Sequence, residues 1–268
     1  FCKKISILNY LFLKGGFMDT KDFLNLNSTI GISSVMGEKT VNQWVGAADN
    51  FTQLMNDTIQ RHGNNPNAHG FIAEAFHTGS YNYDSFLKNS SAKATIGPPN
   101  HLTSDVRVTD STGQIHDHQL KYYKTPNSTM NSISDPKYDG VGKVVPQDQI
   151  NDIKYGAQKA SENVRNIDQG NSYSQTAGNA SDRIAVDNVQ SKPLSYDESR
   201  RIQNNGFYTN QEVFKQFNSE LLTKTLGGSL QASGIAILVS AGFDTVGYYL
   251  KNKKDIHSFE DFCKGAGK

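Results

Sequence analysis

Three residues in the middle of the chain combine groups that could support metal-assisted hydrolysis of a phosphodiester. Asp105 and Gln119 carry carboxylate and amide oxygens, and hard divalent cations such as Mg²⁺ or Mn²⁺ bind to oxygen ligands. Lys121 carries an ammonium group that would position the attacking water or stabilise developing negative charge. A metal held by the oxygens would polarise the phosphate and lower the pKa of its bound water. This chemistry requires the three side chains to share one face of the fold.

The surrounding pattern predicts a β-hairpin that would place them so. Val106 and Val108 alternate with Asp105 and Arg107, and a second alternating run follows the turn at residues 110–113. Because successive side chains of a strand point to opposite faces, Asp117, Gln119 and Lys121 are expected on the face that Asp105 occupies. Asp117, one pleat away from Gln119, is a possible additional metal ligand.

Asp105 followed by Gln119-Leu120-Lys121 on the second strand of a hairpin resembles the PD-(D/E)XK nuclease superfamily. In that superfamily an acidic residue on a preceding helix often completes the site, and the resemblance assigns this place to Glu74. It therefore implies a restriction-endonuclease-like α+β core over residues 67–165, with a metal site made by Glu74, Asp105 and Gln119 and with Lys121 as the catalytic lysine. It also implies a Mg²⁺- or Mn²⁺-dependent nuclease that acts on nucleic acid, DNA in preference to RNA.

The chain departs from the superfamily pattern at two positions. Ser104 stands where a proline is usual, and Gln119 replaces the second carboxylate, which removes one negative charge. Glutamine occurs there both in active members and in inactive, structural relatives, so a catalytically inactive binding module stays open. Residues 119–124 and 144–149 also resemble uncharacterised bacterial proteins of phage or plasmid neighbourhoods, which suggests a role in a mobile-element or phage-defence context.

Other candidate sites have weaker patterns. His116 and His118, with His69, His77 or His101, could bind a transition metal, but core or edge histidines are the more common reading. The segment 140–143 lacks the residues of a phosphate-binding loop. Candidate contacts to nucleic acid are Arg107, Tyr123 and Lys124, although tyrosines on a strand more often pack against a helix.

Periodicity and capping residues place the other elements. Apolar residues at helical spacing predict helices over 38–62, about 68–78 and about 146–165, and 144–145 is expected to be a short strand. Segment 166–195 is polar with little periodicity and is interpreted as a linker or an irregular flap. Capping boxes at Ser195 with Glu198 and at Thr209 with Glu212 predict two further helices.

These elements suggest five parts along the chain. Residues 1–17 resemble a translated leader or a non-native extension before Met18, with an export signal as the rival reading. A helical segment at 18–66 precedes the 67–165 core and the 166–195 linker. A helical, glycine-rich region at 196–268 follows, and we expect that it is truncated.

Composition excludes several classes of protein. Among 268 residues, 27 Lys and Arg balance 26 Asp and Glu, which excludes binding of nucleic acid by bulk positive charge. Two cysteines exclude a disulfide scaffold and a cysteine-rich zinc site. A single tryptophan and a mean hydropathy of −0.58 exclude a polytopic membrane protein.

Residues 225–250 give the alternative to an enzyme. Small residues recur there at helical spacing, which is typical of helices that approach closely, in a membrane or in tight packing. This pattern favours a buried helical hairpin but leaves open a membrane-associated or homo-oligomeric, non-enzymatic protein in which the hairpin at 105–123 is only structural. We expect a bacterial cytoplasmic protein, with membrane association as the alternative.

Overall fold

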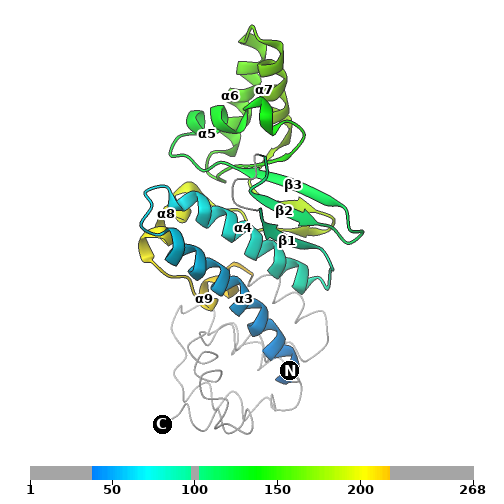
Figure 1. Ribbon diagram of the computed structural model, residues 1–268, viewed down its shortest axis with the longest axis vertical. Coiled ribbons are helices and arrows are strands. Elements are labelled where there is room, and N and C mark those ends of the chain that lie inside the picture. The colour runs from blue at the N-terminus through cyan, green and yellow to red at the C-terminus, as the bar shows by residue number, and fades with distance from the viewer. Residues whose placement is uncertain (1–37, 98–102, 218–268) are drawn as a thin grey trace, which may run out of the picture. The chain divides into compact units, whose positions relative to one another are not determined.

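The computed structural model describes residues 38–97 and 103–217 (Figure 1). Residues 45–213 form one compact unit, and the described residues that flank it, 38–44 and 214–217, belong to a second unit. The predictions for residues 1–17 and 225–250, and for His101, lie outside the described residues.

The fold is α+β, with a small mixed sheet and flanking helices, as the sequence predicts. Five strands pair in the order β1-β2-β3-β4-β5, and β6 and β7 form a separate hairpin. Pairing is antiparallel from β1 to β3 and parallel from β3 to β5. The strands are β1 Lys93–Ile96, β2 Val106–Thr109, β3 Ile115–Leu120, β4 Gly142–Val144, β5 Ala180–Ser181, β6 Ala185–Val186 and β7 Val189–Gln190.

The helices are α3 Glu38–His62, α4 Ala68–Leu87, α5 Pro126–Ile133, α6 Ile150–Asn163, α7 Ile167–Asn179, α8 Tyr196–Asn205 and α9 Asn210–Gln216, with a short 3₁₀ turn, η2, at Pro136–Tyr138. Helix α4 packs against β1, β3, β7 and α8, whereas α6 and α7 pack against each other beside β4 and β5 (Figure 1). The sheet therefore joins two groups of helices.

The predicted hairpin is confirmed. Val106 and Val108 are fully buried, and Arg107 pairs with Asp117 across the two strands. Its turn is closed by hydrogen bonds between Asp110 and residues 112–114, and Gly113 has a positive φ of 89° that a side chain would disfavour. This turn sets the register that decides which side chains face Asp105.

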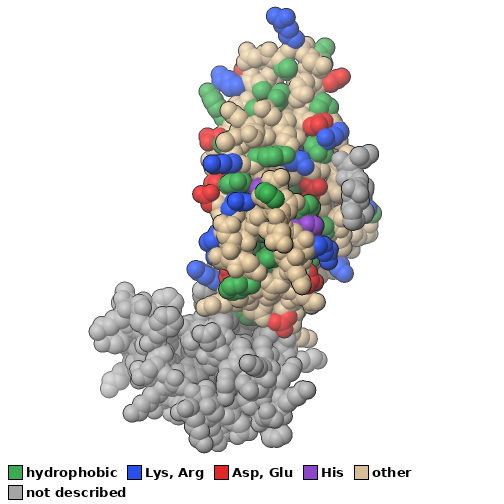
Figure 2. All heavy atoms as spheres, turned by 60° about the vertical axis from the view of Figure 1, so that its left-hand side comes forward, with side chains coloured by type: hydrophobic (Ala, Val, Ile, Leu, Met, Phe, Trp, Pro, Cys, Tyr) green, Lys and Arg blue, Asp and Glu red, His purple; other side chains and the backbone are tan. Residues whose placement is uncertain are grey.

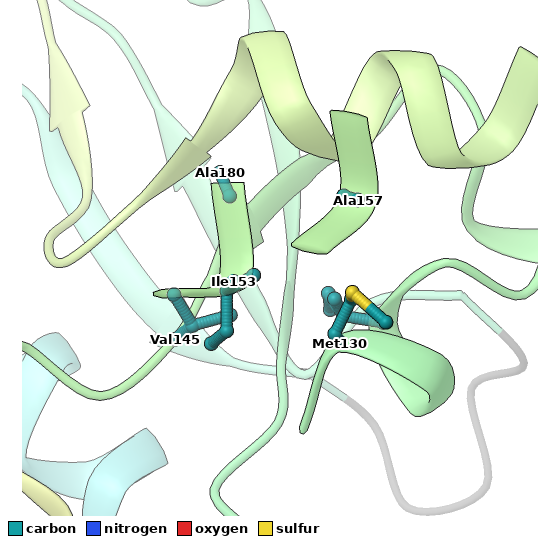
Figure 3. Packing of buried hydrophobic residues seen from close by; sticks show 6 residues of the cluster. Met130, Val145, Ile153, Ala157 and Ala180 are labelled. Carbon is teal, nitrogen blue, oxygen red and sulfur yellow. The ribbon is translucent and has the colours of Figure 1, made fainter. Parts of the chain in front are cut away.

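A small hydrophobic core holds α5 and α6 against the end of the sheet (Figure 3). Ile153 and Ala157 lie one helical turn apart on α6 and are both fully buried, as the helical spacing predicts. They pack with Met130, Ile133, Val145 and Ala180. Burial of this face keeps the segment after β3 next to the sheet.

The predicted helix starts are confirmed, with an N-cap at Ser195 for α8 and a full capping box at Thr209 and Glu212 for α9. Ser195 Oγ accepts a hydrogen bond from the Glu198 amide at 3.0 Å. Thr209 and Glu212 cap each other reciprocally, since Glu212 Oε2 accepts from the Thr209 amide at 2.9 Å.

The interpretation of residues 166–195 as a linker is wrong, because this segment forms α7, β5 and the β6-β7 hairpin. Helix α7 buries polar side chains, Ser172 and Thr176, against the rest of the unit. A helix whose buried face is polar lacks the apolar periodicity on which the interpretation depended.

Two predicted boundaries also differ. Helix α4 runs on to Leu87, because Gly79 continues the helix and allows the ring of Phe51 on α3 to lie against it. Helix α6 begins at Ile150 and not at Pro146, since residues 147–149 form a turn and Gln149 is the N-cap.

Candidate metal and phosphodiester site

The candidate site lies where β2 begins and β3 ends. The backbone of Asp105 is held on both sides, because its amide donates to His118 O at 2.9 Å and its carbonyl accepts from the Gly97 amide at 2.7 Å. Beyond β3, Lys121 N donates to Val144 O at 3.1 Å, which continues the parallel pairing with β4. The backbone positions of Asp105 and Lys121 are therefore fixed by the sheet.

The Asp105 carboxylate is the centre of this site. Its Oδ2 accepts from the Leu120 amide at 2.9 Å and from Nε2 of Gln119, and Lys121 Nζ lies 4.0 Å away. Gln119 is almost fully buried. The sequence prediction that Asp105, Gln119 and Lys121 meet on one side of the hairpin agrees with these contacts.

Glu74 on α4 interacts electrostatically with Asp105 and Lys121. Burial and, to a lesser degree, the charge of Asp105 raise the pKa of its carboxyl, Lys121 opposes the shift, and the result is a pKa of about 8. The pKa of Asp105 is also raised by burial, against the effects of Lys121 and of the hydrogen bonds from Leu120 and Gln119. Two carboxyl groups thus share a partly buried space with one nearby ammonium group, and Glu74 is mostly protonated at neutral pH.

Asp117 is engaged elsewhere. Its carboxylate accepts from Arg107 Nε at 2.8 Å and Nη2 at 3.3 Å, and from the Ser104 hydroxyl at 2.9 Å. The expectation that Asp117 could supply the charge missing at Gln119 therefore finds no support in the contacts. The same fork-like pairing occupies Arg107, one of the predicted contacts to nucleic acid.

The histidines that could have formed a zinc site serve the fold. His77 is fully buried and bonds Ser191 Oγ at 2.8 Å and the Tyr122 hydroxyl at 2.7 Å, and His69 bonds Tyr122 O at 2.9 Å. His116 pairs with Asp110 at 2.8 Å. Within residues 38–97 and 103–217, no three or more His, Cys, Asp or Glu side chains are grouped as metal ligands, and the candidate site has only two carboxylates beside its amide.

Sequence reasoning missed a buried lysine next to the site. Lys143 is the register partner of Gln119 on the neighbouring strand and is 1% exposed. Its Nζ lies 3.1 Å from Thr176 Oγ1 on α7 and 3.5 Å from the Asp139 carboxylate, and burial lowers its pKa. The available sequence signal for Lys143 was its alternation with Val144 along the short strand. Lys143 packs α7 onto the sheet and so supports the strand next to Gln119.

No family model, no curated protein and no solved structure matches this chain. In the part of the chain that the structure describes, no helix is long and apolar enough to cross a membrane.

Proposed function

We propose that this site binds a divalent cation, Mg²⁺ or Mn²⁺, and hydrolyses phosphodiester bonds in nucleic acid, within a core of the restriction-endonuclease-like type. The observation that carries the proposal is the meeting of Asp105, Gln119 and Lys121 with the charge of Glu74. The order of elements also supports it, since the helix with Glu74, α4, is followed by the strands β1, β2 and β3, then by α5 and β4.

The chemistry of the donor set fits such a cation. Glu74, Asp105 and Gln119 offer only oxygen ligands of the kind that Mg²⁺ and Mn²⁺ prefer. Burial raises the pKa of both carboxyl groups, and the positive charge of a divalent cation would favour their ionised forms. In the structure, Gln119 Nε2 donates to Asp105. Rotation of the side-chain amide by half a turn would exchange Nε2 and Oε1, so that Oε1 would face a cation bound at Asp105.

The residues around the cation would have separate roles. The cation, when bound, polarises the phosphate and lowers the pKa of a coordinated water. Asp105 is kept in place by the Leu120 amide, so its orientation does not depend on the ligand. Lys121, at 4.0 Å from Asp105, would meet the negative charge that develops on the phosphate.

A cleavage assay tests the proposal. Supercoiled plasmid and labelled single-stranded DNA and RNA are incubated with the full chain in Mg²⁺, in Mn²⁺ or in a chelator. Asp105→Ala and Lys121→Ala are each expected to lower the cleavage rate by about 100-fold or more, since each removes a group that acts on the reacting phosphate. Activity that survives the double variant would contradict the proposal.

Matched controls come from α6, away from the site. Asp152 and Lys159 are exposed there, so Asp152→Asn and Lys159→Ala should leave cleavage unchanged. Equal losses in these variants would indicate a general effect of charge or folding.

One observation favours a second candidate, a catalytically inactive binding module. The Gln119 amide is already satisfied by Asp105 without a cation, and Gln119 carries no charge to attract one. Calorimetric titration with Mn²⁺ separates the candidates: no Mn²⁺ binding, or binding that is unaffected by Asp105→Ala, favours the inactive module.

A further inference from the structure

We propose that Tyr123, with Lys124, forms a platform on which the bases of single-stranded nucleic acid stack beside the candidate site. The inference names the substrate class of that site and in this respect rests on the proposed function. The binding itself needs no catalysis and is tested separately.

The structure separates the two adjacent tyrosines. Tyr122 is 4% exposed, and its hydroxyl is bonded to His77 and Leu194 O, so it belongs to the core. Tyr123, in contrast, is 45% exposed. An exposed aromatic ring gives up no core packing when it stacks on a ligand.

Two buried polar side chains fix the backbone under this exposed ring. Gln149 Nε2 donates to Tyr123 O at 2.8 Å, and the Tyr123 amide donates to Thr129 Oγ1 at 3.3 Å. Thr129 and Gln149 are 0% and 3% exposed and are joined by a hydrogen bond of 2.8 Å. Burying a polar group costs free energy unless it is hydrogen-bonded, and here Thr129 and Gln149 are paired with each other and with the backbone of Tyr123, which holds that backbone in place.

The hydrogen bonds with Thr129 and Gln149 also hold Tyr123 near positive charge and near the candidate site. Lys121 precedes it by two residues and approaches Asp105, while Lys124 follows it and is exposed. A strand of nucleic acid whose base stacks on Tyr123 would have its backbone close to these two ammonium groups. Arg107, which is paired with Asp117, is not needed for this contact.

The charge distribution favours single strands over duplexes. Figure 2 shows basic and acidic side chains interspersed over the coloured part of the face drawn, without a continuous basic stripe. A duplex is held mainly through its phosphates and hides the faces of its bases, whereas a single strand offers each base for stacking. An exposed aromatic ring such as that of Tyr123 therefore suits a single strand better than a duplex.

Fluorescence anisotropy of a labelled oligonucleotide of about 12 nucleotides, with the full chain in a chelator, tests this inference. Tyr123→Ala is expected to weaken binding of the single strand by about 5- to 100-fold, because stacking of one base contributes ~1–3 kcal/mol. Tyr123→Phe keeps the ring and should bind within about twofold of the parent chain. The same oligonucleotide as a duplex, or as an abasic strand, should bind more weakly.

Helix α6 provides the matched control. Tyr155 is 69% exposed, and Lys159 Nζ lies 5.8 Å from the centre of its ring, so the pair presents the same groups away from the site. Tyr155→Ala should leave affinity unchanged. Thermal melting of each variant checks that the fold is intact.

The outcomes distinguish the inference from the proposed function. Affinity unchanged in Tyr123→Ala, equal binding of the duplex, or no binding of single strands overturns the inference, whether or not the protein cleaves DNA. Binding that depends on Tyr123 in a chain without nuclease activity supports the platform and contradicts the nuclease proposal.

Discussion

Glu74 and Asp105 are both carboxylic acids whose pKa is raised by burial, yet the groups around them differ. Asp105 receives an amide hydrogen bond at 2.9 Å and has an ammonium group at 4.0 Å, which favour its charged form against burial. At Glu74, burial and the charge of Asp105 act in the same direction and raise the pKa of the carboxyl to about 8. A cation that binds between them would lower the pKa of Glu74, so its binding would release the proton that Glu74 holds at neutral pH.

Glu74→Gln should therefore change how stability depends on pH. In the folded chain Glu74 keeps its proton up to about pH 8, compared with 4.5 for the ordinary group. Between these values the folded state binds more protons than the unfolded state, so the parent chain loses stability as pH rises. The free energy of unfolding of Glu74→Gln, relative to the parent, should increase by ~1–3 kcal/mol between about pH 5 and about pH 9.

Urea unfolding followed by circular dichroism, in a chelator, measures this difference. Glu162→Gln is the control, because Glu162 is exposed on α6, where its carboxylate accepts a hydrogen bond from Gln158 Nε2. A difference between Glu74→Gln and the parent that stays constant with pH would show that Glu74 ionises as an ordinary surface group does.

At the scale of elements, close approach of α3 and α4 positions the helix that carries Glu74. Phe51 on α3 lies over Gly79 and packs edge-on against Phe76, with ring centres 5.8 Å apart. A Cβ at Gly79 would overlap the Phe51 ring. Glycine is tolerated in the middle of α4 because this packing outweighs its low helix propensity.

Two glycine substitutions in α4 should have opposite signs. Gly79→Ala should destabilise the chain by ~1–3 kcal/mol, because Phe51 or the helix must shift. Gly70 has open space around its Cβ position, so Gly70→Ala should stabilise by up to ~1 kcal/mol through helix propensity alone. Chemical denaturation of both variants gives the values. Equal effects would mean that α3 does not pack on α4 at Gly79.

For the 45–213 unit as a whole, buried histidines determine the response to acid. Burial lowers the pKa of His77 to about 3 and that of His118 to about 4, and it also lowers the pKa of His69. Each therefore stays neutral in the folded chain at a pH where the unfolded chain takes up a proton. The unfolded state binds more protons below about pH 6.5, so stability falls as pH falls.

The free energy of unfolding should drop by ~2–5 kcal/mol between about pH 7 and about pH 4.5. Glu74 titrates with the opposite sign, so the measurement is cleanest in the Glu74→Gln background. In that background His77→Gln removes one buried titrating group. Its free energy of unfolding, measured by calorimetry, should therefore fall less steeply as the pH falls. An unchanged slope would locate the acid sensitivity outside His77.

How far the sequence predicts this protein depends on the range of the interactions concerned. The hairpin turn, the N-caps at Ser195 and Thr209 and the face of α6 are set by neighbours within a few residues, and the structure contains all of them. Helix α7 was missed because its buried side chains are polar and find their partners, such as Lys143, on a distant strand. The end of α4 was missed because Phe51, on another helix, makes Gly79 favourable within it.

For the candidate site, alternation along two strands was sufficient to place Asp105, Gln119 and Lys121 together, since a strand's period is a local property. Only the tertiary structure decided that Glu74 shares their electrostatic field, that Asp117 pairs with Arg107, and that Tyr122 is buried while Tyr123 is exposed. Those outcomes depend on how helices pack on the sheet, and packing joins residues whose separation along the chain leaves no periodic trace in the sequence.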